Sequence, residues 1–170
     1  MDLTATQYRD VVTYVENLYE GNLDSGSLTN ISAIPWTDWM EVWMQSLNLE
    51  SNLDRDCEIS LRLTGDRQMQ ILNCQYRSID KPSDVLAFAA TETEIVLPPE
   101  MREPLYLGDI IISLDTASRQ AQSQNHSLVT ELAWLSSHGL LHLLGWDHPD
   151  DVSLNQMLQQ QSELIQLLRV

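Results

Sequence analysis

The sequence has few of the features that place a protein in a membrane or in an oxidising compartment. Its purely apolar runs are far shorter than the roughly 20 residues of a membrane-spanning helix. The first residues, 1–6, lack the basic flank and apolar stretch of a secretory signal. Cys57 and Cys74 are too few for a disulfide framework and are not spaced as metal ligands, so we expect two reduced thiols in or at the edge of the core. These absences predict a cytoplasmic protein without membrane contact.

Basic residues are also scarce. Nine Lys and Arg stand against 25 Asp and Glu, which gives a net charge of −16. A protein that binds nucleic acid mainly through the phosphate backbone needs a broad basic surface, so generic nucleic-acid binding is disfavoured. A nuclease is still compatible with this charge, because a small basic cleft beside a metal ion is enough to process a few sites. Most of the carboxylates are predicted to form a solvated surface.

The length of 170 residues and the hydrophobic content of 43% predict one well-packed domain over residues 1–170. The sequence contains no repeats or low-complexity tracts. We expect an α+β fold in which a small mixed β-sheet packs with helices. Residues 1–30 are interpreted as an acidic N-terminal extension of unassigned role.

Apolar periodicity predicts the individual elements. Period-two or continuous apolar patterns predict strands at 57–63, 85–88 and 105–114. Helical spacing predicts helices at 2–20, from Pro35 to about Leu47, at 67–75, from about Ser127 into the histidine-rich segment, and at 151–168. The segments 21–27, 76–84 and 91–104 are predicted to be connections. Asp150 and Asp151 are candidate N-caps for the last helix.

Three of the four histidines, His138, His142 and His148, stand within eleven residues. The first two are four residues apart and therefore project from one face of a helix. Gly145 can adopt the left-handed conformation that ends a helix and turns the chain back, bringing His148 toward the other two. Three imidazoles with an open fourth position form the catalytic arrangement for zinc. We therefore predict a metal site with these three histidines as its ligands.

The same spacing is found in the metzincin motif H-E-x-x-H-x-x-G-x-x-H, which makes a zinc-dependent peptidase or amide hydrolase one alternative. Gly139 stands where that motif has its base glutamate, so a base would have to come from Glu131 or Asp109. A second alternative is a binding module with a structural metal. Structural zinc usually has four ligands, and Asp147 could supply the fourth.

The neighbouring polar residues have more ordinary interpretations. His126 is predicted to be a surface residue. Glu131 is interpreted either as a residue that hydrogen-bonds to a ligand histidine or as a surface group. For Asp147 two roles are equally compatible with the sequence: orienting an imidazole through its second nitrogen, or capping the turn.

The histidine segment resembles the signature H-G-x-L-H-L-x-G-[YW]-D-H of the YbeY endoribonucleases. Tyr76-Arg77 followed by the segment 80–88 is similar to that family's Y-R-x-x-D-K-P-T-[DN]-V-L-S-F. The segment 107–113 is similar to its L-G-D-I strand. The resemblance extends over about residues 58–150. Ser83 and Ala87 depart from it, where the family has threonine and serine.

This resemblance implies a single-domain α+β fold, one zinc ion and single-strand-specific cleavage of RNA. It implies a role in rRNA maturation, notably at the 3′ end of 16S rRNA, and in ribosome quality control. Single-stranded RNA and the small ribosomal subunit are the implied partners, and with this resemblance the structural-metal alternative becomes a ribosome-associated binding module. The ligands carry over to His138, His142 and His148, and the family's functional arginine to Arg77.

The implied chemistry is physically consistent. A zinc-bound water has its pKa lowered to about 7, which supplies hydroxide without a strong protein base and makes the absence of a glutamate at position 139 less important. Arg77 could hold the phosphate with its planar guanidinium and stabilise the transition state. If the ribose 2′-hydroxyl attacks instead, zinc acts as a Lewis acid. The sequence is compatible with both routes.

Overall fold

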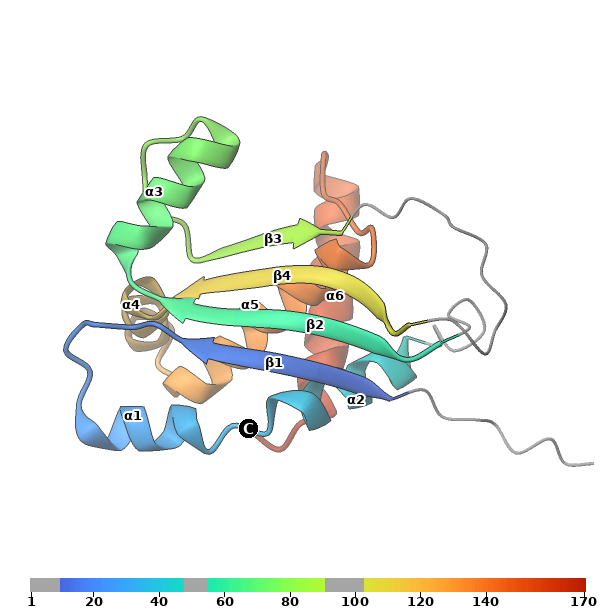
Figure 1. Ribbon diagram of the computed structural model, residues 1–170, viewed down its shortest axis with the longest axis horizontal. Coiled ribbons are helices and arrows are strands. Elements are labelled where there is room, and N and C mark those ends of the chain that lie inside the picture. The colour runs from blue at the N-terminus through green and yellow to red at the C-terminus, as the bar shows by residue number, and fades with distance from the viewer. Residues whose placement is uncertain (1–9, 48–54, 91–102) are drawn as a thin grey trace, which may run out of the picture.

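The computed structural model describes residues 10–47, 55–90 and 103–170. Its centre is a four-stranded sheet with the order β1-β2-β4-β3 (Figure 1). Strands β1 (Val11–Asn17), β2 (Cys57–Thr64) and β4 (Leu105–Ser113) are parallel, and β3 (Val85–Ala89) is an antiparallel edge strand. The predicted small mixed sheet is thus confirmed.

The helices differ in how they cover the sheet. Their bounds are α1 Ser25–Ser32, α2 Trp36–Ser46, α3 Asp66–Arg77, α4 Leu114–Gln124, α5 Leu128–Leu143 and α6 Asp151–Gln166. In Figure 1, α4, α5 and α6 lie behind the sheet, and α3 stands at the β3 edge. Most residues of α5 are buried, so this helix lies at the centre of the domain.

Alternate residues of β4 supply two separate hydrophobic clusters. Ile110 and Ile112 belong to the main core, together with α5 residues such as Leu140. Ile111 belongs to a small second cluster with Met69 of α3 and Leu86 of β3. Because neighbouring strand residues point to opposite faces, α3 packs on the face of the sheet opposite to α5.

The prediction of a helix over residues 2–20 is wrong for the part that the structure describes, because residues 11–17 form β1. The β-branched residues Val11, Val12, Thr13 and Val15 suit a strand. Their backbone pairs with β2, about 46 positions further along the chain, with Val11 opposite Cys57. Because β2 is so distant in the sequence, its pairing with β1 cannot be detected from the local apolar periodicity of residues 11–17. Residues 2–9 lie outside the described residues.

Two other helices depart from the predicted organisation. The connection predicted at 21–27 already contains the start of α1, whose first turn is capped by the Asp24 carboxylate accepting from Ser27 N at 2.8 Å. Helix α4, which the sequence did not predict, begins directly after β4 and is capped by Ser113. Most of the predicted connection 91–104 lies outside the described residues.

The remaining predicted elements agree with the structure within a few residues. Helix α2 follows Pro35, Ser127 caps α5, and Asp150 forms a capping box with Ser153 at the start of α6. None of the described helices is both long and apolar enough to cross a membrane.

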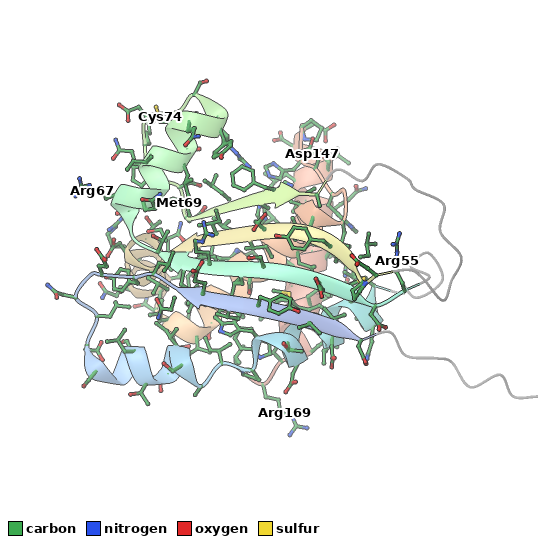
Figure 2. The ribbon with its side chains drawn as sticks, viewed as in Figure 1. Arg55, Arg67, Met69, Cys74, Asp147 and Arg169 are labelled. Carbon is green, nitrogen blue, oxygen red and sulfur yellow. The ribbon has the colours of Figure 1, made fainter. Side chains whose placement is uncertain are left out.

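The two cysteines differ in burial. Cys57 is 1% exposed, as expected. Cys74 is exposed, so its prediction as a core or half-core thiol is wrong. Figure 2 shows the reason: Met69 lies on the side of α3 that faces the sheet, and Cys74 on the side that faces away.

Candidate metal centre

The C-terminus of α5 positions the three histidines through a Schellman motif. Trp146 N donates to Leu141 O and Gly145 N donates to His142 O, both at 3.0 Å. Gly145 has φ +92°, and a Cβ there would meet no atom within 4 Å. Glycine is therefore required by the backbone conformation and not by crowding. The turn reverses the chain, as the sequence predicts, and brings His148 back to His138 and His142.

The three imidazoles form a compact group. Their ring centroids are 4.6, 5.6 and 5.3 Å apart for the pairs 138–142, 138–148 and 142–148. One ligand atom from each ring lies within 4.8 Å of the others. The Nε2 atoms of His138 and His142 are 3.0 Å apart. A tetrahedral zinc ion with bonds of about 2.0–2.1 Å separates its nitrogen ligands by about 3.3 Å, so the group fits a metal ion with little adjustment.

His138 is oriented by a residue that the sequence reasoning missed. Its Nδ1 lies 3.1 Å from Oε1 of Gln161 in α6, and the Gln161 amide donates to Trp134 O at 3.3 Å. Because that donation fixes which end of the amide faces the ring, His138 donates from Nδ1 and keeps the Nε2 lone pair for the metal position. Such an outer contact fixes both tautomer and ring orientation. Gln161 is fully buried.

The surroundings favour neutral imidazoles, the form that binds metal. Burial lowers the pKa of His138, and the neighbouring His148 lowers it further. Burial also lowers the pKa of His142, with additional effects from His138 and His148, whereas a hydrogen bond to the Trp146 backbone raises it. A hydrogen bond raises the pKa of a histidine when the ring N–H is the donor. His142 therefore donates to the Trp146 backbone, as His138 donates to Gln161.

Asp147 takes the second of its two predicted roles. Its carboxylate accepts from His148 N at 2.8 Å and so stabilises the turn. It does not belong to the group of possible metal ligands. Among the described residues, no other His, Cys, Asp or Glu joins the three histidines.

Position 139 faces the sheet and not the metal centre. Gly139 is buried, and a Cβ there would lie 2.7 Å from Ile110 Cγ2. Any side chain at this position would enter the interface between α5 and β4. The glycine thus lets the helix approach the strand closely, and position 139 has no space for a glutamate base.

The other two candidate bases are engaged elsewhere. Glu131 is 4% exposed, so it is not a surface group, and it pairs with His126 Nε2 at 2.5 Å instead of with a ligand histidine. The pair lines a cavity of about 500 Å³, together with Trp134 and Asp84. His126 is exposed overall, as expected, but its ring is held by this contact.

Asp109 lies on the wrong face of the sheet. It alternates with Ile110, which packs toward α5, and it shares the orientation of Ile111 in the second cluster. Its carboxylate accepts a hydrogen bond from the Tyr106 hydroxyl. Asp109 therefore points away from the helix that carries His138 and His142.

Arg77 is the last residue of α3 and is exposed. Its side chain makes no hydrogen bond or ion pair with a described residue. Ser78 follows in the left-handed conformation with φ 57° and ends the helix. In Figure 1, α3 and the N-terminal end of α6, just after the His148 turn, both stand beyond the β3 edge.

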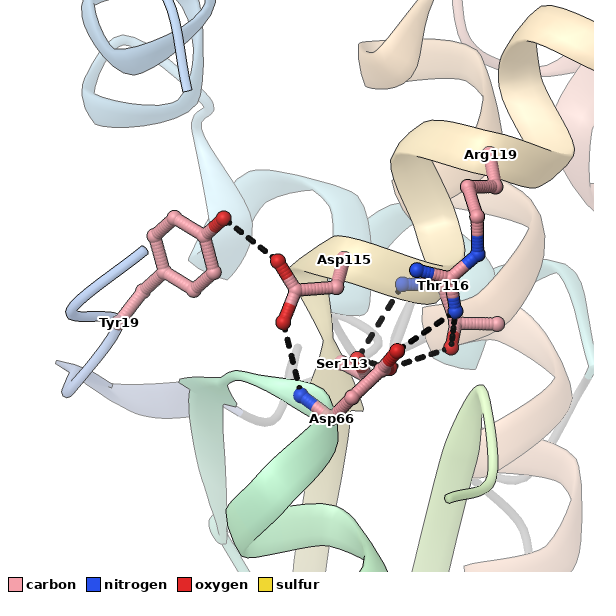
Figure 3. Close-up of polar contacts among 6 residues, drawn as sticks. All are labelled: Tyr19, Asp66, Ser113, Asp115, Thr116 and Arg119. Atoms are coloured by element: carbon pink, nitrogen blue, oxygen red, sulfur yellow. Dashed lines mark hydrogen bonds and ion pairs between the residues drawn. The ribbon is translucent and has the colours of Figure 1, made fainter. Parts of the chain in front are cut away.

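A polar network fixes the other end of α3 (Figure 3). Asp115 accepts from Asp66 N at 2.9 Å and from Tyr19 Oη at 2.7 Å. The Asp66 carboxylate accepts from Ser113 and Thr116 hydroxyls, each at 2.6 Å, and pairs with Arg119 at 2.6 Å. Burial and the bond to Asp115 raise the pKa of Tyr19 to about 12. The network joins α3 to the start of α4 and to the segment after β1.

The fold and the site together define an α+β domain with a three-histidine group suited to a metal ion. The sequence profile of the family described as endoribonuclease YbeY matches residues 24–169. The chain therefore belongs to the YbeY endoribonuclease family. It is accordingly a nuclease of the hydrolase class.

Individual relatives agree with this assignment. The chain is 50% identical over 159 residues to endoribonuclease YbeY of Nostoc sp. (strain PCC 7120), covering 92% of this chain and 86% of the relative. It is 52% identical over 154 residues to endoribonuclease YbeY of Trichormus variabilis, covering 89% and 88%. The solution structure of TM1509 from Thermotoga maritima superposes with a TM-score of 0.53 at 22% identity, covering 91% and 87%, and supports the fold.

Proposed function

We propose that this protein is a single-strand-specific, zinc-dependent endoribonuclease of rRNA maturation. Its proposed tasks are processing at the 3′ end of 16S rRNA and ribosome quality control, in the cytoplasm and in contact with the small ribosomal subunit. The observation that carries the proposal is the three-histidine group in a chain whose relatives are named endoribonucleases.

In this proposal His138, His142 and His148 hold one Zn²⁺. Zinc bound by three histidines supplies Lewis acidity and a nucleophile that is available near neutral pH. Gln161 holds His138 in the tautomer that presents Nε2, and the Trp146 backbone holds His142. The Schellman turn at Gly145 holds His148 against the other two.

Arg77 is proposed to bind the scissile phosphate. Its guanidinium is exposed and makes no ion pair with a described residue, so it is available to an anionic ligand. A planar guanidinium can donate two parallel hydrogen bonds to phosphate oxygens and stabilise the charge that develops on them.

The peptidase alternative is disfavoured by the contacts of all three candidate base positions. Position 139 faces Ile110, Glu131 pairs with His126, and Asp109 points to the other face of the sheet. The alternative of a structural metal is disfavoured because Asp147, the candidate fourth ligand, bonds to the His148 amide and lies outside the ligand group.

The test compares two substrates and two metal states. Metal-loaded and chelated protein are each incubated with a single-stranded RNA and with an unstructured peptide. We expect only the metal-loaded protein to cut, and only the RNA. His142→Ala, purified in parallel, controls for contaminating ribonucleases, and equal RNA cleavage by this variant would overturn the proposal. Cleavage of the peptide instead of RNA would favour the hydrolase alternative.

A further inference from the structure

The outward surface of α3 is exposed along the length of the helix. Arg67, Cys74 and Arg77 are exposed, and the apolar side chain Ile71 is 50% exposed. Figure 2 shows Arg67 and Cys74 pointing away from the sheet. We call the four residues Arg67, Ile71, Cys74 and Arg77 the α3 strip. At 1.5 Å per residue, its two arginines are separated by about 15 Å along the helix axis.

The α3 strip lies in a positively charged part of a strongly acidic chain. Residues 67–81 carry three cations, Arg67, Arg77 and Lys81, against the single anion Asp80. Their net charge is +2, so the other residues of the chain carry −18. Asp66 and Asp84 flank this segment, and Asp66 is paired with Arg119. The phosphates of an RNA strand would therefore be attracted to the cations of this segment and repelled by most of the rest of the chain.

The cations of residues 67–81 are available to a ligand, unlike nearby arginines. Arg62 pairs with Glu16 at 3.1 Å, and Arg119 pairs with Asp66 at 2.6 Å. The side chains of Arg67, Arg77 and Lys81 make no hydrogen bond or ion pair with a described residue, and only the backbone carbonyl of Lys81 is engaged, accepting from Asn73 Nδ2 at 2.8 Å. Asp80, the one anion of residues 67–81, accepts from the Gln70 amide at 2.9 Å.

The shape of this surface also suits an extended ligand. A hollow of about 380 Å³ is lined by Arg67, Ile71 and Cys74 of the strip, together with Gln70, Gln75 and the anionic Asp80. Single-stranded nucleic acid is bound by cations that follow the backbone and by nonpolar surface that meets the unstacked bases. The strip offers both, and Arg77 at its end is the residue proposed above to bind the scissile phosphate.

We propose that the α3 strip binds the backbone of the single-stranded RNA next to the cleavage site, with Arg67 contacting a phosphate about 15 Å from Arg77 along α3. This inference rests on the proposed nuclease function for the orientation of the strand. The binding itself can be measured without cleavage.

The test is the affinity of the full-length, metal-loaded protein for a fluorescent single-stranded 2′-O-methyl RNA, whose integrity is checked on a gel. Arg67→Glu is compared with Arg169→Glu, a matched reversal at an exposed arginine beside the C-terminus and away from α3 (Figure 2). We expect Arg67→Glu to weaken binding about five- to tenfold and to lower the salt dependence, log Kd against log salt, by about 0.7 or more. Arg169→Glu should change neither.

The outcomes separate this inference from the proposed function. The proposal for the α3 strip would be overturned if Arg67→Glu and Arg169→Glu changed the RNA affinity equally. It would also be overturned if the unsubstituted protein did not bind the RNA. If RNA binding depends on Arg67 but the protein cuts no RNA, the α3 strip is still an RNA-binding surface and the proposed nuclease function is refuted.

Cys74 provides a second, independent readout. Cys74 is exposed whereas Cys57 is 1% exposed. A thiol-reactive photocrosslinker therefore labels Cys74, which lies on the α3 strip. We expect crosslinks from Cys74 to the bound RNA and few from a control label at Arg169→Cys in the Cys74→Ser background. Equal yields from the two positions would contradict the proposal.

Discussion

Gln161 gives the most specific test of how the metal centre is built. Replacing it by methionine keeps a flexible side chain of similar size in a fully buried position, but removes the oxygen that accepts from His138 Nδ1 at 3.1 Å. The ring then loses the contact that selects its tautomer and orientation. Trp134 O, the other partner of the amide, keeps a hydrogen bond from Ser137 Oγ at 2.8 Å.

The expected effect is therefore on metal binding more than on folding. Loss of an outer-shell partner weakens metal affinity by about 10- to 100-fold, or about 1.4–2.7 kcal/mol. The stability of the metal-free protein should change by only about 1 kcal/mol, because the lost hydrogen bond is partly offset by burial of an apolar side chain.

The assay is a competition titration of Zn²⁺ against a chromogenic chelator, with thermal unfolding of the metal-free protein measured in parallel. Gln156→Met, at an exposed position of the same helix, is the control and should bind zinc like the original chain. Unchanged affinity in Gln161→Met, or a loss fully explained by unfolding, would refute the role assigned to Gln161.

Three further predictions concern separate parts of the structure. Gly139→Ala should destabilise the protein by about 1–3 kcal/mol in chemical denaturation, because its Cβ would lie 2.7 Å from Ile110 Cγ2. Combined with Ile110→Ala it should cost less than the sum of the two single changes, and strict additivity would contradict the contact. Tyr19 has a pKa raised to about 12 against about 10 in the unfolded chain, so its stabilising contribution is fully present below about pH 10 and is lost as the pH rises toward 12. The stability advantage over Tyr19→Phe, measured by urea unfolding at about pH 9 and pH 11, should shrink at the higher pH; a constant difference would count against the bond to Asp115. Arg77→Ala should keep one zinc per chain by metal analysis while RNA cleavage falls by two to three decades, equivalent to about 2–4 kcal/mol. Loss of metal or of folded structure would instead make Arg77 structural.

The ligand group could be predicted from the sequence because its geometry is local. The spacing of His138 and His142 follows from the helical repeat, and the Schellman turn at Gly145 brings in His148 within six residues. The partner Gln161 comes from a different helix, so no local pattern identifies it. The available signal was indirect, since this polar residue interrupts the apolar stripe formed by Met157 and Leu164 on α6.

The structural role of Gly139 could not be predicted from the sequence either. The missing glutamate argued against a peptidase, but the contact with Ile110 is between residues 29 positions apart and required the packing of α5 on β4. Strand β1 was mistaken for a helix for a similar reason, because its pairing with β2 is long-range. Helix α4, by contrast, was detectable, since Leu114, Ala117 and Ala121 are buried at helical spacing.

The most direct test of the central claim is a titration of Zn²⁺ into chelated protein while cleavage of a single-stranded RNA is followed. The structure predicts that the rate rises in proportion to the metal, reaches a plateau at one equivalent per chain and stays at background in His142→Ala. A rate that is independent of zinc, or equal in His142→Ala, would contradict the assignment of the three-histidine group as the metal centre of a ribonuclease.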